Sequence, residues 1–281
     1  MPSFDTPEPI ALNAQVSAGS VHVIATDRAD TVVRARPRDP LREVDVRAAE
    51  QTEIEFAGGV LTVRTPRQRH LLGRTGTVDV SVELPAGSRL EAGGAWMQVL
   101  GEGPLGEVQV KTASGDIRLG SAGPVHLTAA HGSITVDRVR GRAEISTSSG
   151  SVRVGLLDGP AVVKNSYGST TVAVAADDLR VSGANGDITV ERAAASLRAG
   201  TARGALLVGE VARGSVQLET GFGGIEIGVR SGTAAWLDVS AQRGQVRNSL
   251  TGADAPEQHE ETVEVRARSR YGNIDIRRAR A

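Results

Sequence analysis

The chain has 281 residues and a formal net charge of −1, so no overall charge draws it toward nucleic acid or an anionic membrane. Cysteine is absent, which excludes disulfide bonds, thiol catalysis and thiolate metal sites. Aromatic residues make up only 2% of the sequence, so a core has to be filled mainly by stacked Val, Ile, Leu and Ala.

Residues 1–10 contain neither a basic stretch nor an apolar stretch, and we therefore expect no signal peptide. No apolar run of about eighteen residues, the length that a transmembrane helix needs, occurs elsewhere. On these grounds we expect a cytoplasmic protein with no membrane span.

Short alternating segments occur in residues 1–90, but they do not recur at a fixed spacing. They predict strands at 29–35, 53–56, 59–63 and 78–84, while 19–23 resembles the repeat described below. A repeat protein must hide its terminal coil, because the free backbone groups would otherwise pair with other chains. We therefore predict that residues 1–90 form a β cap and irregular first coils, continuous with a repetitive body at 91–281.

Two segments of this first region carry different predictions. Residues 40–51 combine Leu41, Val44 and Val46 with charged residues. We expect an irregular or edge strand there rather than a helix. Residues 65–75 carry arginines, a histidine, a proline and a glycine, which favour a solvated loop.

A glycine that opens an alternating pentad recurs about every 18 residues in the rest of the chain. The steps between successive glycines are 17, 18, 18, 18, 18, 19, 21 and 28. The glycines of the series are Gly115, Gly132, Gly150, Gly168, Gly186, Gly204, Gly223, Gly244 and Gly272. A fixed period of this length is the signature of a solenoid.

Each repeat contains two short alternating strands. With the glycine as position 0, apolar residues occupy +2 and +4 and also −7 and −5, with a weaker apolar position at +7. Alternation means that one face of each strand is buried. The sequence predicts an all-β fold, a single-stranded parallel β-helix or β-solenoid with coils of about 18 residues.

Two other folds compete with this prediction. Hairpins of a sandwich would have no reason to keep a constant period. A left-handed hexapeptide helix would need a large aliphatic residue every six positions, and the inward positions do not follow that spacing. We therefore favour a right-handed coil.

The 28-residue step marks an insertion at about 248–261, with an acidic run at 257–261, and we expect a mobile loop. The last coil is expected to run from Thr262 to Ile276. The basic tail that follows, with Arg277, Arg278 and Arg280, is predicted to be a solvated cap at the end of the stack.

Several stretches carry a family resemblance. They are Ser-Gly-Asp-Ile at 114–117, Val-Asp-Val-Ser-Val-Glu-Leu-Pro at 78–85, Gly-Gln-Val-Arg-Asn-Ser at 244–249, and Tyr-Gly-Asn-Ile-Asp-Ile-Arg at 271–277. Together they resemble the bacterial putative-adhesin β-strand-repeat family, a family of unknown function, over about residues 10–278. The resemblance implies a β-helical body, an adhesive role and no established catalytic residues.

The residues that could carry chemistry do not converge. His126 and His131 share one coil but occupy outward and corner positions. Asp116 and Asp187 share position +1, yet four coils, about 19 Å of stacking, separate them, which is too far for a pair of catalytic carboxylates. We predict no catalytic residue, no cofactor and no bound metal.

The residues at position −1 form a column whose side chains are suited to binding a partner. It becomes more aromatic and more cationic toward the C-terminal end, and such residues are favoured at interfaces. The residues that we expect to bind are His131, Tyr167, Asn185, Arg203, Phe222, Arg243 and Tyr271. The alternative is that these side chains only shield the glycine turns.

The sequence favours a non-catalytic scaffold or adhesin-like interaction protein, which binds a protein or an extended polymer and not nucleic acid. A self-assembling filament of cytoskeletal type is one alternative, and it would need both ends of the stack to be apolar and uncapped. A carbohydrate-active β-helix enzyme is another. The sequence is also compatible with a homo-oligomer.

Overall fold

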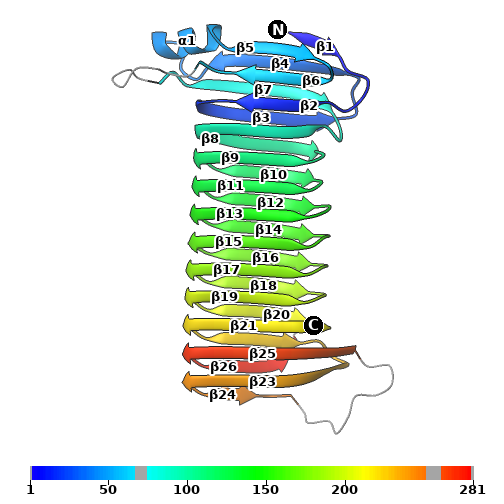
Figure 1. The fold of residues 1–281 in the computed structure, drawn as a ribbon, viewed down its shortest axis with the longest axis vertical. Coiled ribbons are helices and arrows are strands. Elements are labelled where there is room, and N and C mark those ends of the chain that lie inside the picture. Colours follow the sequence, from blue (N-terminus) through cyan, green and yellow to red (C-terminus); the bar gives the residue numbers. More distant parts are fainter. Residues whose placement is uncertain (1, 67–74, 251–260, 280–281) are drawn as a thin grey trace. The chain divides into compact units, whose positions relative to one another are not determined.

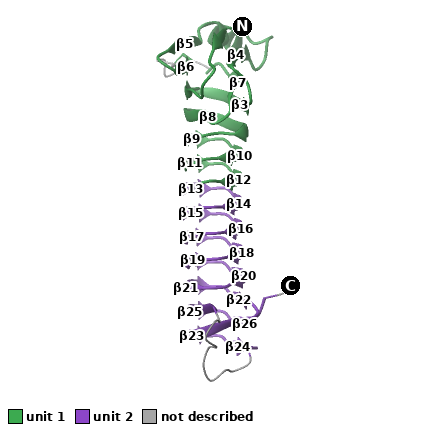
Figure 2. Cartoon of the chain, turned by 90° about the vertical axis from the view of Figure 1, so that its right-hand side faces the viewer, with its two compact units in different colours: residues 1–140 green, residues 141–281 purple. Residues whose placement is uncertain are grey.

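The computed structural model describes residues 2–66, 75–250 and 261–279, which form 26 strands and one helix. The chain separates into two compact units, residues 1–140 and residues 141–281, which Figure 2 colours differently. The boundary that we predicted after residue 90 falls inside one long strand, β8 (Arg89–Pro104), and that division stays a prediction. The two predicted loops lie largely outside the described residues.

The first unit contains regular coils of two strands joined at a corner. These strands are β9 (Val108–Ser114), β10 (Ile117–Ala122), β11 (Val125–His131) and β12 (Ile134–Val139). β11 pairs with β9 and β12 pairs with β10, both in parallel. The long strand β8 forms a complete coil, because its first half pairs with β9 and its second half with β10. Inward side chains such as Val110 and Ile117 are fully buried.

The stacking order in this unit differs from the chain order. β2 (Ala11–Gln15) and β3 (Ala18–Thr26) form the first coil of the sequence, and both pair with β8. On their other side they pair in parallel with β6 (Val60–Arg64) and β7 (Val78–Pro85). The first coil therefore lies one layer inside the stack.

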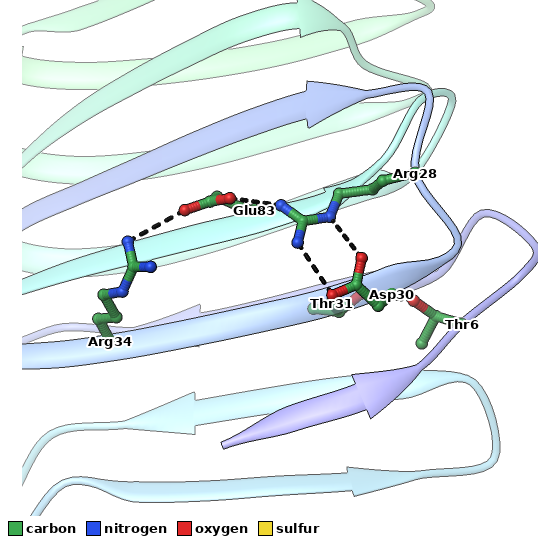
Figure 3. Close-up of polar contacts among 6 residues, drawn as sticks. All are labelled: Thr6, Arg28, Asp30, Thr31, Arg34 and Glu83. Carbon is green, nitrogen blue, oxygen red and sulfur yellow. Dashed lines mark hydrogen bonds and ion pairs between the residues drawn. The ribbon is translucent and has the colours of Figure 1, made fainter. Parts of the chain in front are cut away.

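The predicted N-terminal β cap is confirmed. It consists of β1 (Ser3–Asp5), β4 (Asp30–Pro37) and β5 (Glu53–Ala57). β4 pairs antiparallel with β7, β1 with β4, and β5 with β6. Figure 3 shows the polar contacts that hold this region: Arg28 binds Asp30 with N–O distances of 2.9 and 3.0 Å and also binds Glu83, which in turn accepts from Arg34 at 3.0 Å.

Our expectation of a strand within residues 40–51 is wrong, because α1 (Glu43–Glu50) forms there. Asp45 and Ala48, three residues apart on one helical face, are buried, and the Asp45 Oδ1 accepts a hydrogen bond from the Thr77 amide at 3.0 Å. Leu41, one of the apolar residues behind the strand prediction, is 93% exposed. The short polar contact with Thr77, rather than an apolar stripe, anchors this helix.

The second unit begins with five coils whose strands stack in register, apart from an irregularity between β20 and β22 after Val208. Their strands are β13 (Ala143–Ser149), β14 (Val152–Leu157), β15 (Ala161–Tyr167), β16 (Thr170–Ala175), β17 (Leu179–Asn185), β18 (Ile188–Ala193), β19 (Leu197–Arg203), β20 (Leu206–Val211), β21 (Gly214–Phe222) and β22 (Ile225–Val229). The odd-numbered strands pair in parallel with one another, and so do the even-numbered strands. We call these series the odd ladder and the even ladder. The predicted parallel β-solenoid is confirmed, whereas its handedness stays a prediction.

The C-terminal end of this unit departs from our expectation. β25 (Glu261–Tyr271) and β26 (Ile274–Arg278) pair with β21 and β22 on one side. On the other side they pair with β23 (Thr233–Arg243) and β24 (Val246–Asn248), so the predicted last coil is the second last in the stack (Figure 1). Burial follows this order: Val265 is fully buried between two coils, whereas Leu237 of β23 is only half-buried.

The basic tail does not cover the end of the stack either. The Arg278 side chain donates to the backbone oxygens of Arg230 and Thr233, both at 3.0 Å. It is therefore bound beside the turn that leads into β23, and Arg280 lies outside the described residues. The expected end cap at this tail is wrong because the coil that carries the tail is an inner coil.

The interior contains a polar column at position −3, which we did not predict. Thr201 donates to the Gly186 carbonyl at 3.3 Å, and Thr220 donates to the Gly204 carbonyl at 2.9 Å. Ser269 makes the equivalent contact with Gly223 at 3.0 Å. Each hydroxyl satisfies the corner carbonyl of the neighbouring coil, which a wholly apolar core would leave without a partner.

Candidate interaction surface

Position −1 lies at the end of each odd-ladder strand, directly before the corner glycine. In the second unit the parallel register aligns these residues in the spatial order Ser149, Tyr167, Asn185, Arg203, Phe222, Tyr271 and Arg243. Tyr271 therefore lies between Phe222 and Arg243, and not at the end of the column where its sequence position put it. We call the segment from Tyr167 to Arg243 in this spatial order the ridge.

The last four ridge residues form one continuous stack. The rings of Phe222 and Tyr271 are nearly parallel, with an interplanar angle of 5° and centroids 4.6 Å apart. The guanidinium of Arg203 lies 5.8 Å from the Phe222 centroid, and that of Arg243 lies 5.0 Å from the Tyr271 centroid. Arg243 also donates to the Tyr271 hydroxyl at 3.0 Å. Cation–π attraction therefore holds both ends of the aromatic pair.

The ridge is accessible to solvent. Tyr167 is 60% exposed and Phe222 is 49% exposed. Position −2, beside them, carries small residues such as Ala184, Ala202 and Gly221. Large side chains that project next to small ones can offer aromatic faces and guanidinium donors to a partner.

His131 belongs to the first unit, where the register groups it with Ser114 and Trp96. Trp96 is 62% exposed, and our sequence reasoning missed it. The signal was present, because Trp96 lies one repeat period before Ser114. A hollow of about 1350 Å³, which Asn13 and Gln15 also line, adjoins this tryptophan.

The acidic residues at position +1 act as structural acceptors. The Asp116 Oδ1 accepts from the Ser133 amide at 2.9 Å, and the Asp187 Oδ1 accepts from the Ala205 amide at 2.8 Å. Each carboxylate thus ties its corner to the next coil. Over residues 2–66, 75–250 and 261–279, no group of three or more His, Asp or Glu side chains lies close enough together to hold a metal ion. In the same residues, no helix is long and apolar enough to cross a membrane.

A family model described as Toastrack DUF4097 matches residues 10–280. A comparison with curated proteins finds no significant match. Among solved structures, a putative adhesin from Parabacteroides merdae ATCC 43184 has 14% sequence identity and a TM-score of 0.48, with 80% of this chain and 94% of that chain covered.

Two structures from Parabacteroides distasonis ATCC 8503 are similar over 98% of this chain and 95% of their own. One, a putative adhesin, has 14% identity and a TM-score of 0.45. The other, a putative lipid binding protein, has 11% identity and a TM-score of 0.42. At these identities and TM-scores, their names carry no functional information for this chain.

Proposed function

The chain belongs to the Toastrack DUF4097 family, a domain family of unknown function, and within that family we propose that it is a non-catalytic interaction scaffold with an adhesin-like role. The ridge would hold the partner, which is a protein or an extended polymer. Membership confirms the resemblance to a bacterial putative-adhesin repeat family that the sequence motifs indicated.

The continuous stack from Arg203 to Arg243 is the observation that carries this proposal. Shielding of a glycine turn requires only that one side chain cover each corner. Stacked rings at 4.6 Å with a guanidinium at each end go beyond that requirement, because they fix the side chains of four coils relative to one another. A rigid array loses little side-chain entropy when a partner binds.

The non-catalytic part of the proposal is supported by what the acidic residues do. The Asp187 Oδ1 accepts a hydrogen bond from a backbone amide, and Asp238 forms an ion pair with Arg268 at 2.6 Å. A glycosidase needs two carboxyl groups that flank a bond, with separated pKa values. A depolymerisation assay with neutral and acidic polysaccharides tests this part, and release of reducing ends would contradict it.

We keep the cytoplasmic location as part of the proposal, and cell fractionation with an antibody to the chain tests it. The filament alternative receives no support from the first unit, since antiparallel strands β1, β4 and β5 cover its outer coil. Negative-stain images that show fibres would revive that alternative.

The ridge is tested by the triple variant Tyr167→Ala/Arg203→Ala/Phe222→Ala. We expect it to lose crosslinked partners that the unchanged chain captures from its native lysate, because the aromatic faces and the guanidinium are removed together. The matched control is Arg153→Ala/Arg192→Ala/Leu207→Ala, three outward positions of the even ladder. The control should capture the same partners.

Circular dichroism and thermal melting test whether both triple variants keep the fold. If the ridge variant is folded and captures the same partners in the same amounts, the ridge is not the binding surface. The side chains at position −1 would then serve only to shield the corners.

A further inference from the structure

Two arginines face each other on the outer surface of the odd ladder. The register pairs Arg180 of β17 with Arg198 of β19, so their backbones are about 4.8 Å apart. Both side chains are exposed. In the part of the chain that the structure describes, neither forms an ion pair with a carboxylate; the Arg198 Nε donates to the neutral Gln217 amide oxygen at 2.9 Å.

Two other arginines that line this surface are neutralised. Arg266 binds Glu264 at 2.6 Å, and Arg268 binds Asp238 at 2.6 Å, which lowers the pKa of Asp238. Like charges directly opposite each other on neighbouring strands destabilise a sheet. The repulsion between Arg180 and Arg198 is not relieved by a carboxylate of the fold, whereas Arg266 and Arg268 each have one, which points to an anion supplied from outside.

The surface around the pair is hollowed. One hollow of about 410 Å³ and another of about 560 Å³ share Arg180 and Arg198 in their linings. We call the two hollows together the arginine groove. Its other polar linings include Ser182, Ser196 and Gln217, which are neutral hydrogen-bonding side chains.

Three further arginines and two acidic residues also border the groove. Arg142 and Asp178 line the smaller hollow, and Asp178 accepts from the Ser196 amide at 3.3 Å. Glu219 lines the larger hollow together with the two neutralised arginines, Arg266 and Arg268. The remaining charges are three arginines, Arg142, Arg180 and Arg198, against Asp178 and Glu219, so the groove is positive by one charge.

We propose that the arginine groove binds an acidic glycan, with a carboxylate or sulfate group held between Arg180 and Arg198. A guanidinium presents two parallel N–H donors that match such an anion. The serine hydroxyls and the Gln217 amide are suited to sugar hydroxyl groups. This site is separate from the ridge and does not depend on the function proposed for it.

Two other polyanions fit the groove less well. The strands of the groove are paired on both sides within the odd ladder, so an acidic peptide cannot add to them as a new strand. Nucleic acid is disfavoured by the net charge of −1, because neutralisation of many phosphates needs a broad basic surface. An acidic glycan needs only local cations among neutral donors.

The test measures binding of the full chain to fluorescent polygalacturonate and heparin at fixed ionic strength, with dextran and poly-L-glutamate as comparison polymers. We expect saturable binding of at least one of the two acidic glycans. The variant Arg180→Gln/Arg198→Gln should weaken it by about 10- to 100-fold, the loss expected for two charge-assisted contacts. The matched control Arg153→Gln/Arg192→Gln removes two charges from the even ladder, and we expect it to bind like the unchanged chain.

Four results would overturn the proposal. The first is that neither acidic glycan binds. The second is that poly-L-glutamate binds as tightly, which would assign the groove to acidic peptides. The third is that both double variants lose binding equally, which would reflect net charge alone. Loss of glycan binding in the ridge variant, with the groove variant unaffected, would move the glycan to the ridge and also count against the groove.

Discussion

Two requirements favour glycine at the corners: a positive φ angle and the lack of room for a Cβ atom. Gly186 has φ of +145°, which side chains rarely adopt, and a Cβ atom there would lie 2.1 Å from the Gly168 carbonyl oxygen of the neighbouring coil. That same carbonyl column receives the hydroxyls of position −3, such as Thr201 and Thr220. The glycine period therefore records the close approach of coils as well as a turn.

Replacement of one corner glycine should therefore cost more than its φ angle alone predicts. We expect Gly186→Ala to lower the free energy of unfolding by about 3 kcal/mol, since backbone strain and steric overlap add. Gly232→Ala is the control, because Gly232 has φ of +77° but nothing within 4 Å of the added atom. We expect about 1 kcal/mol there. Urea unfolding measures both; equal losses would mean that the stacked carbonyl contributes nothing.

At the scale of elements, a small group of charges holds the N-terminal cap. Arg28 precedes β4 and joins Asp30 at the start of that strand to Glu83 of β7, while Arg34 of β4 binds the same Glu83 (Figure 3). Hydrogen bonds from Arg28 lower the pKa of both carboxyl groups. The contact between an antiparallel and a parallel strand thus depends on two ionised carboxylates.

This cluster predicts a specific response to acid. Because both pKa values are lowered by folding, their contribution is complete above the unfolded values of about 3.9 to 4.3 and is lost as the pH falls through the folded values. Arg28→Gln should therefore lower the melting temperature at pH 7, and the difference from the unchanged chain should shrink below about pH 4. Arg36→Gln, on the exposed side of β4, is the control. A constant difference from pH 7 to about pH 2.5 would exclude the carboxylates as the cause.

The order of the coils at the C-terminal end of the second unit leads to a prediction about the stability of β25 relative to β23. Val265 of β25 lies in register between Val216 and Leu237, whereas Val239 of β23 has a neighbouring coil on one side only among the residues that the structure describes. Val265→Ala should cost about 2 kcal/mol of unfolding free energy, and Val239→Ala less than about 1 kcal/mol. Denaturant unfolding compares the two valine variants directly. The reverse order would place residues 262–276 at the end of the stack, as the sequence suggested.

At the scale of the whole molecule, the sequence predicts the structure of a single coil better than the order in which the coils stack. The glycine period specifies the shape of one coil, and the columns at −7, −5, +2 and +4 are buried as expected except in the coil of β23 and β24. It does not specify which coil is the neighbour, because every coil offers the same backbone edge and similar apolar columns. That is why the inner positions of β2–β3 and of β25–β26 were missed.

For the candidate site too, the sequence predicts the residues of a column but not which coils are neighbours. The period alone locates Tyr167, Asn185, Arg203 and Phe222 in one column. The contact between Phe222 and Tyr271 could not be predicted, since it depends on the inverted order of the last two coils. The arginine groove was missed for another reason. Whether an arginine has a carboxylate partner depends on contacts between strands, and the spacing of residues along the chain does not predict those contacts.

The inner position of β25–β26 also sets the order in which the second unit can be completed during synthesis. β23 and β24 leave the ribosome first, yet neither pairs with β21 or β22. Their native neighbours exist only after residues 261–278 have been made and have folded back. Until then, the edge of β21 and β22 is either open or paired with β23 and β24 in a non-native order, and a product that stops after residue 250 never reaches the native order. Such an edge is the feature that aggregation and quality control act on.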